Sequence, residues 1–417
     1  MRAPSVTHRQ HCRLCEAANL LLVLPIAASP IADAYVPAER LGEKQDAYPL
    51  DLYLCLTCGH VQNLDVVNPE ILFRDYVYVT ASSLGLVEHY RRYAEEVTTR
   101  FGLKPGSLVV EIGSNDGSLL EFFKEKGCNV VGVDPAQQIA AAATAKGILT
   151  LPEFFSSALA DEIRSRHGPA SVVAANNVFA HSDNLADIVR GIRTLLADDG
   201  VFVFENSYLV DIVDRFLFDT VYHEHVSYHS IAPLKTFFER LGMQLIDVQR
   251  IASKGGSIRG FAQRLPEGKR PVAPIVAELL AMESARGFAQ PQVYREYAQA
   301  IDARKQALTR LLEGARAQGK TVAGYGASTT VTTLMWHFDL TDKIDFLADD
   351  NPRKEGLYSP GCHVPVVASK EIYSRRPDYV IILAWNYAQP IIDRHRRFLE
   401  EGGKFVVPLP DLRVVTA

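Results

Sequence analysis

Four cysteines near the N-terminus limit how the first part of this chain can fold. They form two Cys-x2-Cys pairs, namely Cys12, Cys15, Cys55 and Cys58. Two such pairs can place four thiolates at tetrahedral corners around one zinc ion. Because all four positions are cysteine, no position remains for a catalytic water, so we expect the zinc to be structural. Two disulfides or free thiols are the alternative, and His11 and His60 beside the pairs could compete as ligands.

Length and composition restrict the class of protein. A chain of 417 residues exceeds what one hydrophobic core usually spans, so two or three domains are expected. The net charge of −5 and the absence of a basic run argue against nucleic acid as a partner. No apolar stretch reaches the roughly 18 residues of a membrane span, and no signal peptide is recognised. We therefore expect a cytoplasmic enzyme without membrane association, either a monomer or a weak homo-oligomer.

Strands and helices are predicted to alternate through the middle of the chain. The expected strands cover 107–112, 129–133, 171–175 and 200–205, with a closing pair at 243–251 and 257–263. The expected helices cover 86–101, 118–126, 136–145, 184–196 and 235–241. Alternation of this kind predicts an α/β domain, with a parallel sheet covered by helices on both faces.

A proline-rich linker at 265–274 separates this part from the rest of the chain. A long helical stretch is predicted over 275–318, interrupted only by Pro291, and a second α/β unit has strands at 321–324, 344–348 and 379–383. The predicted domains are thus a zinc module at 1–75, an α/β domain at 76–265, and a helical linker with a smaller α/β domain at 266–417.

A glycine turn follows the first strand of the middle domain. It reads Glu111-Ile-Gly113-Ser-Asn115-Asp116-Gly117, which lacks the middle glycine of the dinucleotide fingerprint. Glu111 would also repel a pyrophosphate, whereas it suits the ammonium and sulfonium of S-adenosylmethionine. An ordinary turn between a strand and a helix is the alternative.

An acidic residue ends the second strand. Asp134 lies about 20 residues after Gly113, where a carboxylate meets a ribose diol. A nicotinamide-binding domain would carry the same acid, so this residue alone does not discriminate. After the third strand, Asn176 and Asn177 begin a loop that ends at His181 and is expected to cover the adenine or face the substrate. For His181, a helix cap or a solvent-facing position is the alternative.

The densest group of ionisable side chains is Tyr222-His223-Glu224-His225, followed by Val-Ser-Tyr-His. The two histidines are only two residues apart, so the His-Glu-x-x-His pattern of metalloproteases is absent. On an extended segment, alternation would put Glu224 opposite to both histidines. A polar loop is the alternative, but the position after the strand that ends in Glu-Asn-Ser, 205–207, favours a catalytic site.

With the zinc pairs, the glycine turn, the eight-residue histidine segment and Gly-Gly-Ser-Ile-Arg at 255–259, the sequence resembles the sugar-nucleotide C-methyltransferases over nearly its whole length. Those enzymes add a methyl group at C3 of dTDP-linked 4-keto-deoxyhexoses in the biosynthesis of unusual deoxysugars, including antibiotic sugars. The resemblance implies an N-terminal zinc-binding module, a central class I S-adenosylmethionine-dependent methyltransferase domain, and a C-terminal Rossmann-like domain that helps to hold the nucleotide sugar.

The resemblance also implies roles for individual residues. His225 would remove the C3 proton, Tyr222 and Glu224 would orient the sugar or the base, and Tyr76 and His181 would flank the sugar. Which of Tyr76, Tyr222 and His181 donates to the C4 oxygen stays open. The cofactor would contact Glu111, Gly113, Asn115, Asp116, Gly117, Asp134, Asn176 and Asn177. The substrate would contact Tyr78, Lys254, Ser257, Arg259, Gly326, Ala327 and Ser328.

A second glycine signal begins at Gly324 and resembles a Rossmann phosphate loop, although its sixth position is Thr329. Nucleotide-sugar binding is the favoured interpretation, with NAD binding or a purely structural unit as alternatives. Two other functions therefore stay open, an NAD(P)-dependent sugar-nucleotide oxidoreductase that uses this C-terminal unit and a non-catalytic zinc-containing binding protein.

Overall fold

The computed structural model describes residues 5–74, 79–82 and 85–417. Its N-terminal part contains two small sheets. One joins β1 (Val6–His8) to β5 (Asp65–Val67) and the other has the order β11-β4-β3-β2. The strands of the second sheet are β2 (Leu20–Leu24), β3 (Leu52–Cys55), β4 (Val61–Asn63) and β11 (Ser227–Tyr228). Because β11 comes from the histidine segment, this sheet joins the N-terminal part directly to the middle of the chain.

The central sheet has seven strands in the order β12-β13-β10-β9-β6-β7-β8. Strand β13 runs antiparallel to both of its neighbours, and the other neighbouring strands pair in parallel. The bounds are β6 (Leu108–Ile112), β7 (Asn129–Val133), β8 (Thr150–Leu151), β9 (Ala170–Asn176), β10 (Leu196–Ser207), β12 (Met243–Ile251) and β13 (Ser257–Arg264).

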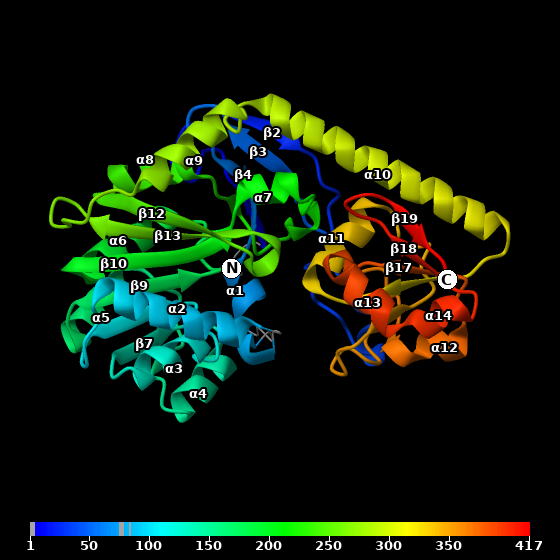
Figure 1. Cartoon of the computed structure of the whole chain (residues 1–417), viewed down its shortest axis with the longest axis horizontal. Helices are drawn as coiled ribbons and strands as arrows, with labels where there is room; N and C mark the ends of the chain where they lie inside the picture. Colours follow the sequence, from blue (N-terminus) through cyan, green and yellow to red (C-terminus); the bar gives the residue numbers. More distant parts are fainter. Residues whose placement is uncertain (1–4, 75–78, 83–84) are drawn as a thin grey trace.

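Helices cover both faces of this sheet (Figure 1). Side chains alternate along each strand, so Val109 and Val172 pack under one group of helices while Val110 and Val173 pack under the other. The first group contains α2 (Leu86–Phe101) and α3 (Ser118–Glu125). The second contains α5 (Ser157–His167), α6 (Leu185–Leu195) and α8 (Ile231–Arg240). The remaining helices before residue 270 are α1 (Pro69–Phe73), α4 (Gln137–Ala145) and α7 (Leu209–Asp214).

The stretch predicted as helical over 275–318 forms two helices, α9 (Pro274–Ala285) and α10 (Pro291–Ala317). Proline has no N–H to donate within a helix, so Pro291 begins α10 rather than continuing α9. Gly287, with φ of 72°, lies in the connection. The predicted stretch is therefore helical, but it forms two helices instead of one.

The C-terminal sheet has six strands in the order β16-β15-β14-β17-β18-β19, parallel except for the last pair. The strands are β14 (Val322–Tyr325), β15 (Leu347–Asp349), β16 (Val366–Ala368), β17 (Tyr379–Ile382), β18 (Lys404–Val407) and β19 (Arg413–Val415). The helices are α11 (Thr329–His337), α12 (Ile372–Arg375), α13 (Ala388–Arg394) and α14 (Arg396–Glu400). The predicted α/β fold class is thus confirmed.

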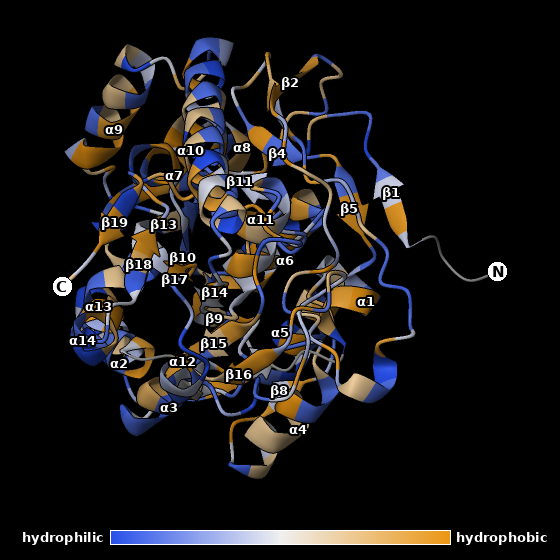
Figure 2. Cartoon of the chain, turned by 90° about the vertical axis from the view of Figure 1, so that its right-hand side faces the viewer, coloured by the Kyte–Doolittle hydropathy of each residue, from blue (hydrophilic) through white to orange (hydrophobic). Residues whose placement is uncertain are grey.

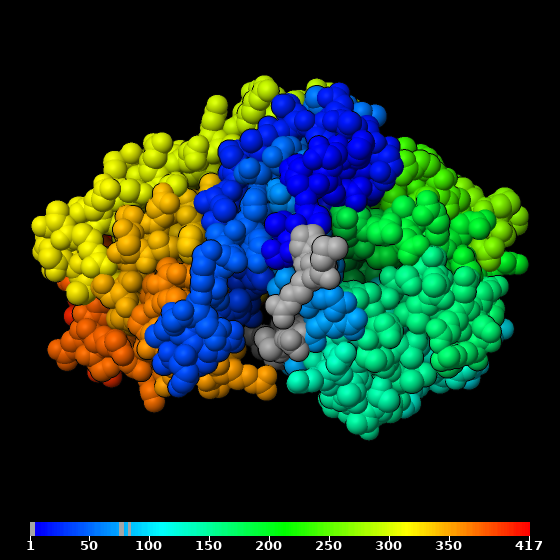
Figure 3. Space-filling view, turned by 180° about the vertical axis from the view of Figure 1, so that it is seen from behind, coloured from blue at the N-terminus to red at the C-terminus, as the bar shows by residue number. Residues whose placement is uncertain are grey.

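The N-terminal part lies between the central and C-terminal sheets and contacts both (Figure 3). Val36 pairs with Tyr358 in an isolated antiparallel bridge, and Lys354 forms an ion pair with Asp33. In Figure 2 the strands of the large sheets are mostly hydrophobic, whereas α10 carries many hydrophilic residues. Among the described residues, we find no helix that combines the length and the hydropathy of a membrane span.

Candidate active site

A cavity of about 220 Å³ opens at the carboxyl edge of the central sheet. It is bounded by the glycine turn after β6, the loop after β9, the histidine segment and a short helical turn, Ser253–Gly255, before β13. Of the predicted site residues, the cavity is lined by Gly113, Asn115, Asp134, Asn176, Asn177, His181, Tyr222, Glu224, His225 and Lys254. The carboxyl ends of parallel strands bring these distant parts of the chain together.

The glycine turn approaches the loop after β9 too closely for any side chain. Gly113 has φ of 69°, and a Cβ built there would lie 2.2 Å from Val178 Cγ2. Two residues further along, Asn115 has φ of 49° and donates its N–H to Asp134 Oδ2 at 2.8 Å. This hydrogen bond joins the glycine turn to the end of β7. Gly113 therefore brings bare backbone to the cavity wall.

Asp134 lines the cavity from the end of β7 while its carboxylate organises the surrounding backbone. Besides the Asn115 amide, it accepts the Ala136 N–H at 2.9 Å. Burial raises the pKa of Asp134 above its usual value, and the two amide hydrogen bonds oppose that rise. A carboxylate has further acceptor positions, so Asp134 can still accept the hydroxyls of a ribose.

Asp116 and Gly117 lie outside the cavity lining. Asp116 caps α3 by accepting the Ser118 N–H at 3.1 Å, and its other oxygen accepts the Ala81 N–H at 3.0 Å. The Asn115 side chain likewise accepts the Thr80 N–H at 2.8 Å. The Asn115 and Asp116 side chains thus hold the chain before α2 against the glycine turn. This structural role differs from the cofactor contact predicted for them.

Glu111 is buried beneath the turn and does not line the cavity. Asn176 donates its Nδ2–H to Glu111 Oε1 at 3.4 Å. Desolvation raises the pKa of Glu111 well above its ordinary value, so the carboxyl group favours its neutral form there. The predicted attraction between a Glu111 charge and a bound cation is therefore not what this position provides.

His225 lies in the cavity with one ring nitrogen already engaged. Its Nδ1 is 2.8 Å from the carbonyl oxygen of Thr220, an acceptor, so Nδ1 carries the proton and Nε2 is left as an acceptor. The ring lies against Tyr222 at 4.1 Å and against His181 at 5.1 Å between centroids. Burial lowers the pKa of His225 to about 4, with the Thr220 carbonyl opposing the shift and Lys254 adding to it. The imidazole is therefore neutral near pH 7.

His181, on the loop after β9, lies beside the same ring in a neighbouring wall of the cavity. It stacks on Phe73 at 5.8 Å, and its buried Nε2 has no hydrogen-bond partner among the described residues. Desolvation lowers the pKa of His181 well below its ordinary value, and His225 and Lys254 add to the effect. Two neutral imidazoles and the Tyr222 phenol therefore surround one part of the cavity.

The alternation predicted for the histidine segment is wrong. The His225 N–H donates to the Tyr222 carbonyl at 2.9 Å, so the chain turns here instead of extending. As a result Tyr222, Glu224 and His225 all line the cavity, whereas His223 points away and its Nε2 lies 3.2 Å from the Tyr48 carbonyl. Glu224 is buried on the same side as His225 rather than opposite to it.

The predicted substrate contacts are distributed unevenly. Lys254 reaches the cavity, and the surrounding protein lowers its pKa while Glu224 and Glu205 oppose that shift. Ser257 is buried and donates its hydroxyl to the Ser253 carbonyl at 3.0 Å. The structure places Ser257 away from the cavity lining.

Arg259 is also away from the cavity. Its guanidinium is buried between two carboxylates, 2.7 Å from Glu96 and 2.6 Å from Glu205. Those bonds satisfy the cation within the protein, so Arg259 is engaged elsewhere than in the predicted contact with the substrate. Tyr76 and Tyr78, predicted to contact the sugar, lie outside the described residues.

The C-terminal glycine signal forms the predicted turn after β14, at a different place from the cavity. The Ala327 N–H donates to Asp349 Oδ2 at 2.6 Å, so a carboxylate already occupies the amide that a phosphate would use. A Cβ on Gly326 would lie 2.9 Å from Ala384 Cβ. Gly326, Ala327 and Ser328 do not line the cavity of the central sheet.

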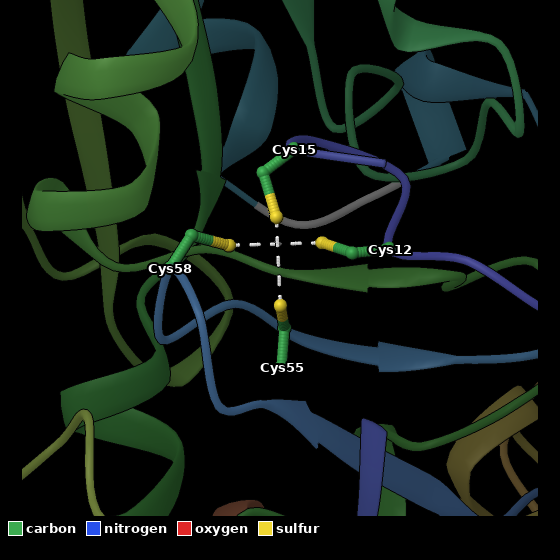
Figure 4. Close-up of side chains that lie close together, drawn as sticks. All are labelled: Cys12, Cys15, Cys55 and Cys58. Atoms are coloured by element: carbon green, nitrogen blue, oxygen red, sulfur yellow. Dashed lines mark hydrogen bonds between the residues drawn. The ribbon is translucent and has the colours of Figure 1, made fainter. Parts of the chain in front are cut away.

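The four N-terminal cysteines converge on one point (Figure 4). All four sulfur atoms lie within 4.8 Å of one another, with Cys12 and Cys58 Sγ at 3.6 Å and Cys15 and Cys55 Sγ at 3.5 Å. A tetrahedral ion with Zn–S bonds of about 2.3 Å needs sulfur atoms about 3.8 Å apart. The four thiolates fit zinc, none of them forms a disulfide, and His11 and His60 are not part of this cluster.

Several residues of the cavity were not predicted. Tyr90 comes from the buried face of α2, and Phe154 and Phe155 follow β8, a strand of only two residues. The mostly apolar run at 148–151 could have indicated Phe154 and Phe155, because a third parallel strand ending there would place the residues after it at the same edge of the sheet. No comparable sequence pattern indicated that Asp183, two residues after His181, lines the cavity.

Comparison with known proteins agrees with this arrangement. Residues 12–73 match a family described as a zinc binding domain, residues 86–248 match a methyltransferase domain, and residues 252–410 match the C-methyltransferase C-terminal domain. The C-methyltransferase NovU of Streptomyces niveus is 38% identical over 412 residues, which is 97% of each chain. This chain belongs to the C-methyltransferase family. It is an enzyme that uses S-adenosylmethionine and contains a structural zinc site, as predicted, rather than a non-catalytic binding protein.

Solved structures that match this C-methyltransferase cover less than half of its chain. Magnesium protoporphyrin IX methyltransferase from Synechocystis PCC 6803 with bound SAM is 15% identical, with a TM-score of 0.35, covering 48% of this chain and 98% of that one. The CcbJ methyltransferase from Streptomyces caelestis is 15% identical, with a TM-score of 0.35, covering 47% and 96%.

Proposed function

We propose that this C-methyltransferase methylates C3 of a dTDP-linked 4-keto-deoxysugar through an enolate, in deoxysugar biosynthesis. The observation that supports this most is the 2.8 Å contact between His225 Nδ1 and the Thr220 carbonyl oxygen, which fixes the tautomer of the ring. Its Nδ1–H is held by the Thr220 carbonyl, so Nε2 is directed to take a proton inside a cavity that the glycine turn also lines. Carbon becomes nucleophilic only after losing a proton, and a carbon next to a ketone is acidic enough for an imidazole to assist.

The residues around His225 support the same chemistry. When the C3–H bond breaks, the proton moves to His225 Nε2 and the electron pair moves toward the ketone oxygen. A hydrogen-bond donor is needed at that oxygen, and Tyr222 and His181 both lie against the His225 ring. Lys254 adds a cation to the same cavity, which favours an anionic enolate.

The glycine turn and Asp134 would hold the cofactor on the other side of the cavity. When bound, S-adenosylmethionine supplies a sulfonium-activated methyl group, which the nucleophilic carbon accepts as S-adenosylhomocysteine is released. Asp134 would accept the ribose hydroxyls, and Gly113, which lines the same cavity, would lie beside the amino-acid end. The oxidoreductase alternative has less support, because Asp349 already occupies the Ala327 amide of the C-terminal turn.

The test separates proton removal from methyl transfer. The enzyme is incubated with S-adenosylhomocysteine and a dTDP-4-keto-deoxysugar in heavy water, and hydrogen exchange at C3 is followed by NMR. We expect wild-type enzyme to exchange this hydrogen, and His225→Asn to exchange it about 10²- to 10⁴-fold more slowly, because a positioned base contributes that factor.

His223→Asn is the matched control, because His223 is adjacent in sequence but faces Tyr48 instead of the cavity. It should exchange C3 hydrogen at nearly the wild-type rate. If His225→Asn exchanges as fast as wild type while binding S-adenosylhomocysteine normally, the base is another residue. If wild type exchanges no hydrogen from any 4-keto sugar nucleotide, the proposed substrate is wrong.

A further inference from the structure

The segment that carries Tyr222, Glu224 and His225 has little regular structure of its own. It is a turn followed by the two-residue strand β11. Its position therefore depends on contacts with other parts of the chain. β11 pairs with β4 of the N-terminal module, and the Asn63 N–H donates to the Val226 carbonyl at 3.1 Å. The C-terminal unit also contributes, since Thr333 donates its hydroxyl to the Val221 carbonyl at 2.7 Å.

Arg13 is the main side-chain contact between the first cysteine pair and this segment. It stands between the two cysteines of that pair, and its side chain is fully buried. Nη1 donates to the Val226 carbonyl at 2.7 Å and to Gln62 Oε1 at 3.1 Å. Nη2 donates to the Asn63 carbonyl at 2.9 Å, and Nε donates to Asp183 Oδ1 at 3.0 Å. One planar guanidinium thus joins four acceptors.

Two of these acceptors lie close in sequence to the two imidazoles, in neighbouring walls of the candidate active site. Val226 directly follows His225, and Asp183 lies two residues after His181. The two walls also meet through the backbone, because the Val226 and Ser227 N–H groups donate to the Ala180 carbonyl at 3.0 and 3.1 Å. Arg13 consequently holds the chain beside both imidazoles.

The energetics of the buried Arg13 guanidinium indicate that this residue fixes the positions of its partners. Burying a guanidinium costs free energy that its partners offset only when the hydrogen-bond geometry is good. Arg13 has a single carboxylate partner, Asp183, and Arg9 also donates to that carboxylate at 3.0 Å. The other three acceptors are neutral. A rigid fork with five donors on three nitrogen atoms can fix four acceptors spread around one plane, whereas the three donors of a lysine ammonium leave from a single atom and an apolar side chain has none.

We propose that Arg13 is a positioning residue that holds Val226 and Asp183 in place and so sets His225 beside His181. This inference rests on the proposed role of His225 as the base. The first cysteine pair then has a role beyond the folding of its own module, because Arg13, which lies between the two cysteines, contacts the wall of the active site. Arg13 itself does not line the cavity, so it acts through the backbone of its partners.

The experiment compares Arg13→Met and Arg13→Lys with Arg9→Met as the matched control. Arg9 donates to the Asp183 carboxylate and carbonyl and to the His11 carbonyl, but within the part of the chain that the structure describes it has no bond to the histidine segment. Four quantities are measured for the full-length enzyme: bound zinc, affinity for S-adenosylhomocysteine, amide hydrogen exchange of peptides covering 222–229, and hydrogen exchange at C3 of the sugar.

Arg13→Met should keep its zinc and its affinity for S-adenosylhomocysteine, yet exchange the amides of 222–229 faster than wild type. It should exchange the C3 hydrogen about 10- to 100-fold more slowly, since small displacements of a base have effects of that size. Arg13→Lys, which keeps the charge but has only one donor group, should lie between Arg13→Met and wild type. Arg9→Met should resemble wild type in all four measurements.

Unchanged amide exchange over 222–229 in Arg13→Met would overturn the proposal. So would loss of zinc together with loss of cofactor affinity, which would indicate a general structural role. If Arg13→Met does not fold, Asp183→Asn replaces it and should show the same pattern in weaker form, and wild-type behaviour would overturn the proposal. The amide measurement needs no sugar, so it decides the role of Arg13 even if wild type fails to exchange the C3 hydrogen and the proposed function is wrong.

Discussion

The lowered pKa of His229 can be tested through the pH dependence of the free energy of unfolding. Its ring is fully buried between His60, at 5.7 Å, and Phe179, at 5.5 Å between centroids. Burial is the largest cause that lowers the pKa of His229 to about 3; the Phe179 backbone opposes this shift, and the charge of Arg13 adds to it. In the unfolded chain the pKa of a histidine is about 6.5.

The sign of the pH effect follows from these two values. Between pH 7 and pH 5 the folded protein keeps His229 neutral, whereas the unfolded chain takes up a proton. Stability that is present above the unfolded pKa is therefore lost as the pH falls. For one such group the free energy of unfolding decreases by about 2 kcal/mol between pH 7 and pH 5.

We predict that His229→Phe removes this contribution. The aromatic ring can still pack between His60 and Phe179, but it takes up no proton in either state. The difference in the free energy of unfolding, wild type minus His229→Phe, should decrease by about 2 kcal/mol from pH 7 to pH 5. Urea denaturation followed by tryptophan fluorescence at both pH values measures it, and the contributions of zinc release and other groups cancel in the difference.

Tyr228→Phe is the control, because it changes the neighbouring side chain without removing a group that titrates between pH 5 and pH 7. Its difference from wild type should be the same at both pH values. If the difference for His229→Phe stays constant within about 0.5 kcal/mol, the folded protein carries a protonated or hydrated His229, and the reasoning from burial fails.

Two further predictions concern the cofactor and the metal. Asp134→Ala should weaken S-adenosylhomocysteine binding by about 1–3 kcal/mol, as expected when a hydrogen bond to a charged group is lost, and unchanged calorimetric affinity would remove Asp134 from the cofactor site. Wild type should bind about one zinc per chain and Cys55→Ser should lose it with a lower melting temperature, because a closed four-thiolate site contributes directly to folding. Metal analysis that finds equal zinc in both proteins would contradict this assignment.

Much of the fold could be predicted because apolar runs and helical periodicity are local signals. The predicted strands at 129–133 and 243–251 coincide with β7 and β12. The elements that were missed have weak local signals, such as β8, with two residues, and α7 (Leu209–Asp214), with six. Strand β11 could not be found from its own sequence, because its partner β4 lies more than a hundred residues earlier in the chain.

The candidate site divides in the same way. Gly113 and Asp134 could be placed together from sequence, since both end neighbouring parallel strands whose carboxyl edges must meet. The separation of His223 from His225 could not, because it depends on a turn closed by the Tyr222 carbonyl. The resemblance implies a substrate contact for Arg259, but the tertiary structure buries this residue between Glu96 and Glu205.

The sequence by itself therefore determined the zinc ligands, the α/β class and the residues available for proton transfer, because these depend on residue type, spacing and periodicity. Only the tertiary structure decided which of those residues share one cavity. It left Nε2 of His225 as an acceptor, buried Glu111 outside the cavity lining, and joined Arg13 of the first cysteine pair to the chain beside His225. Burial and hydrogen-bond partners are set by segments that are far apart in the chain, and no local pattern encodes them.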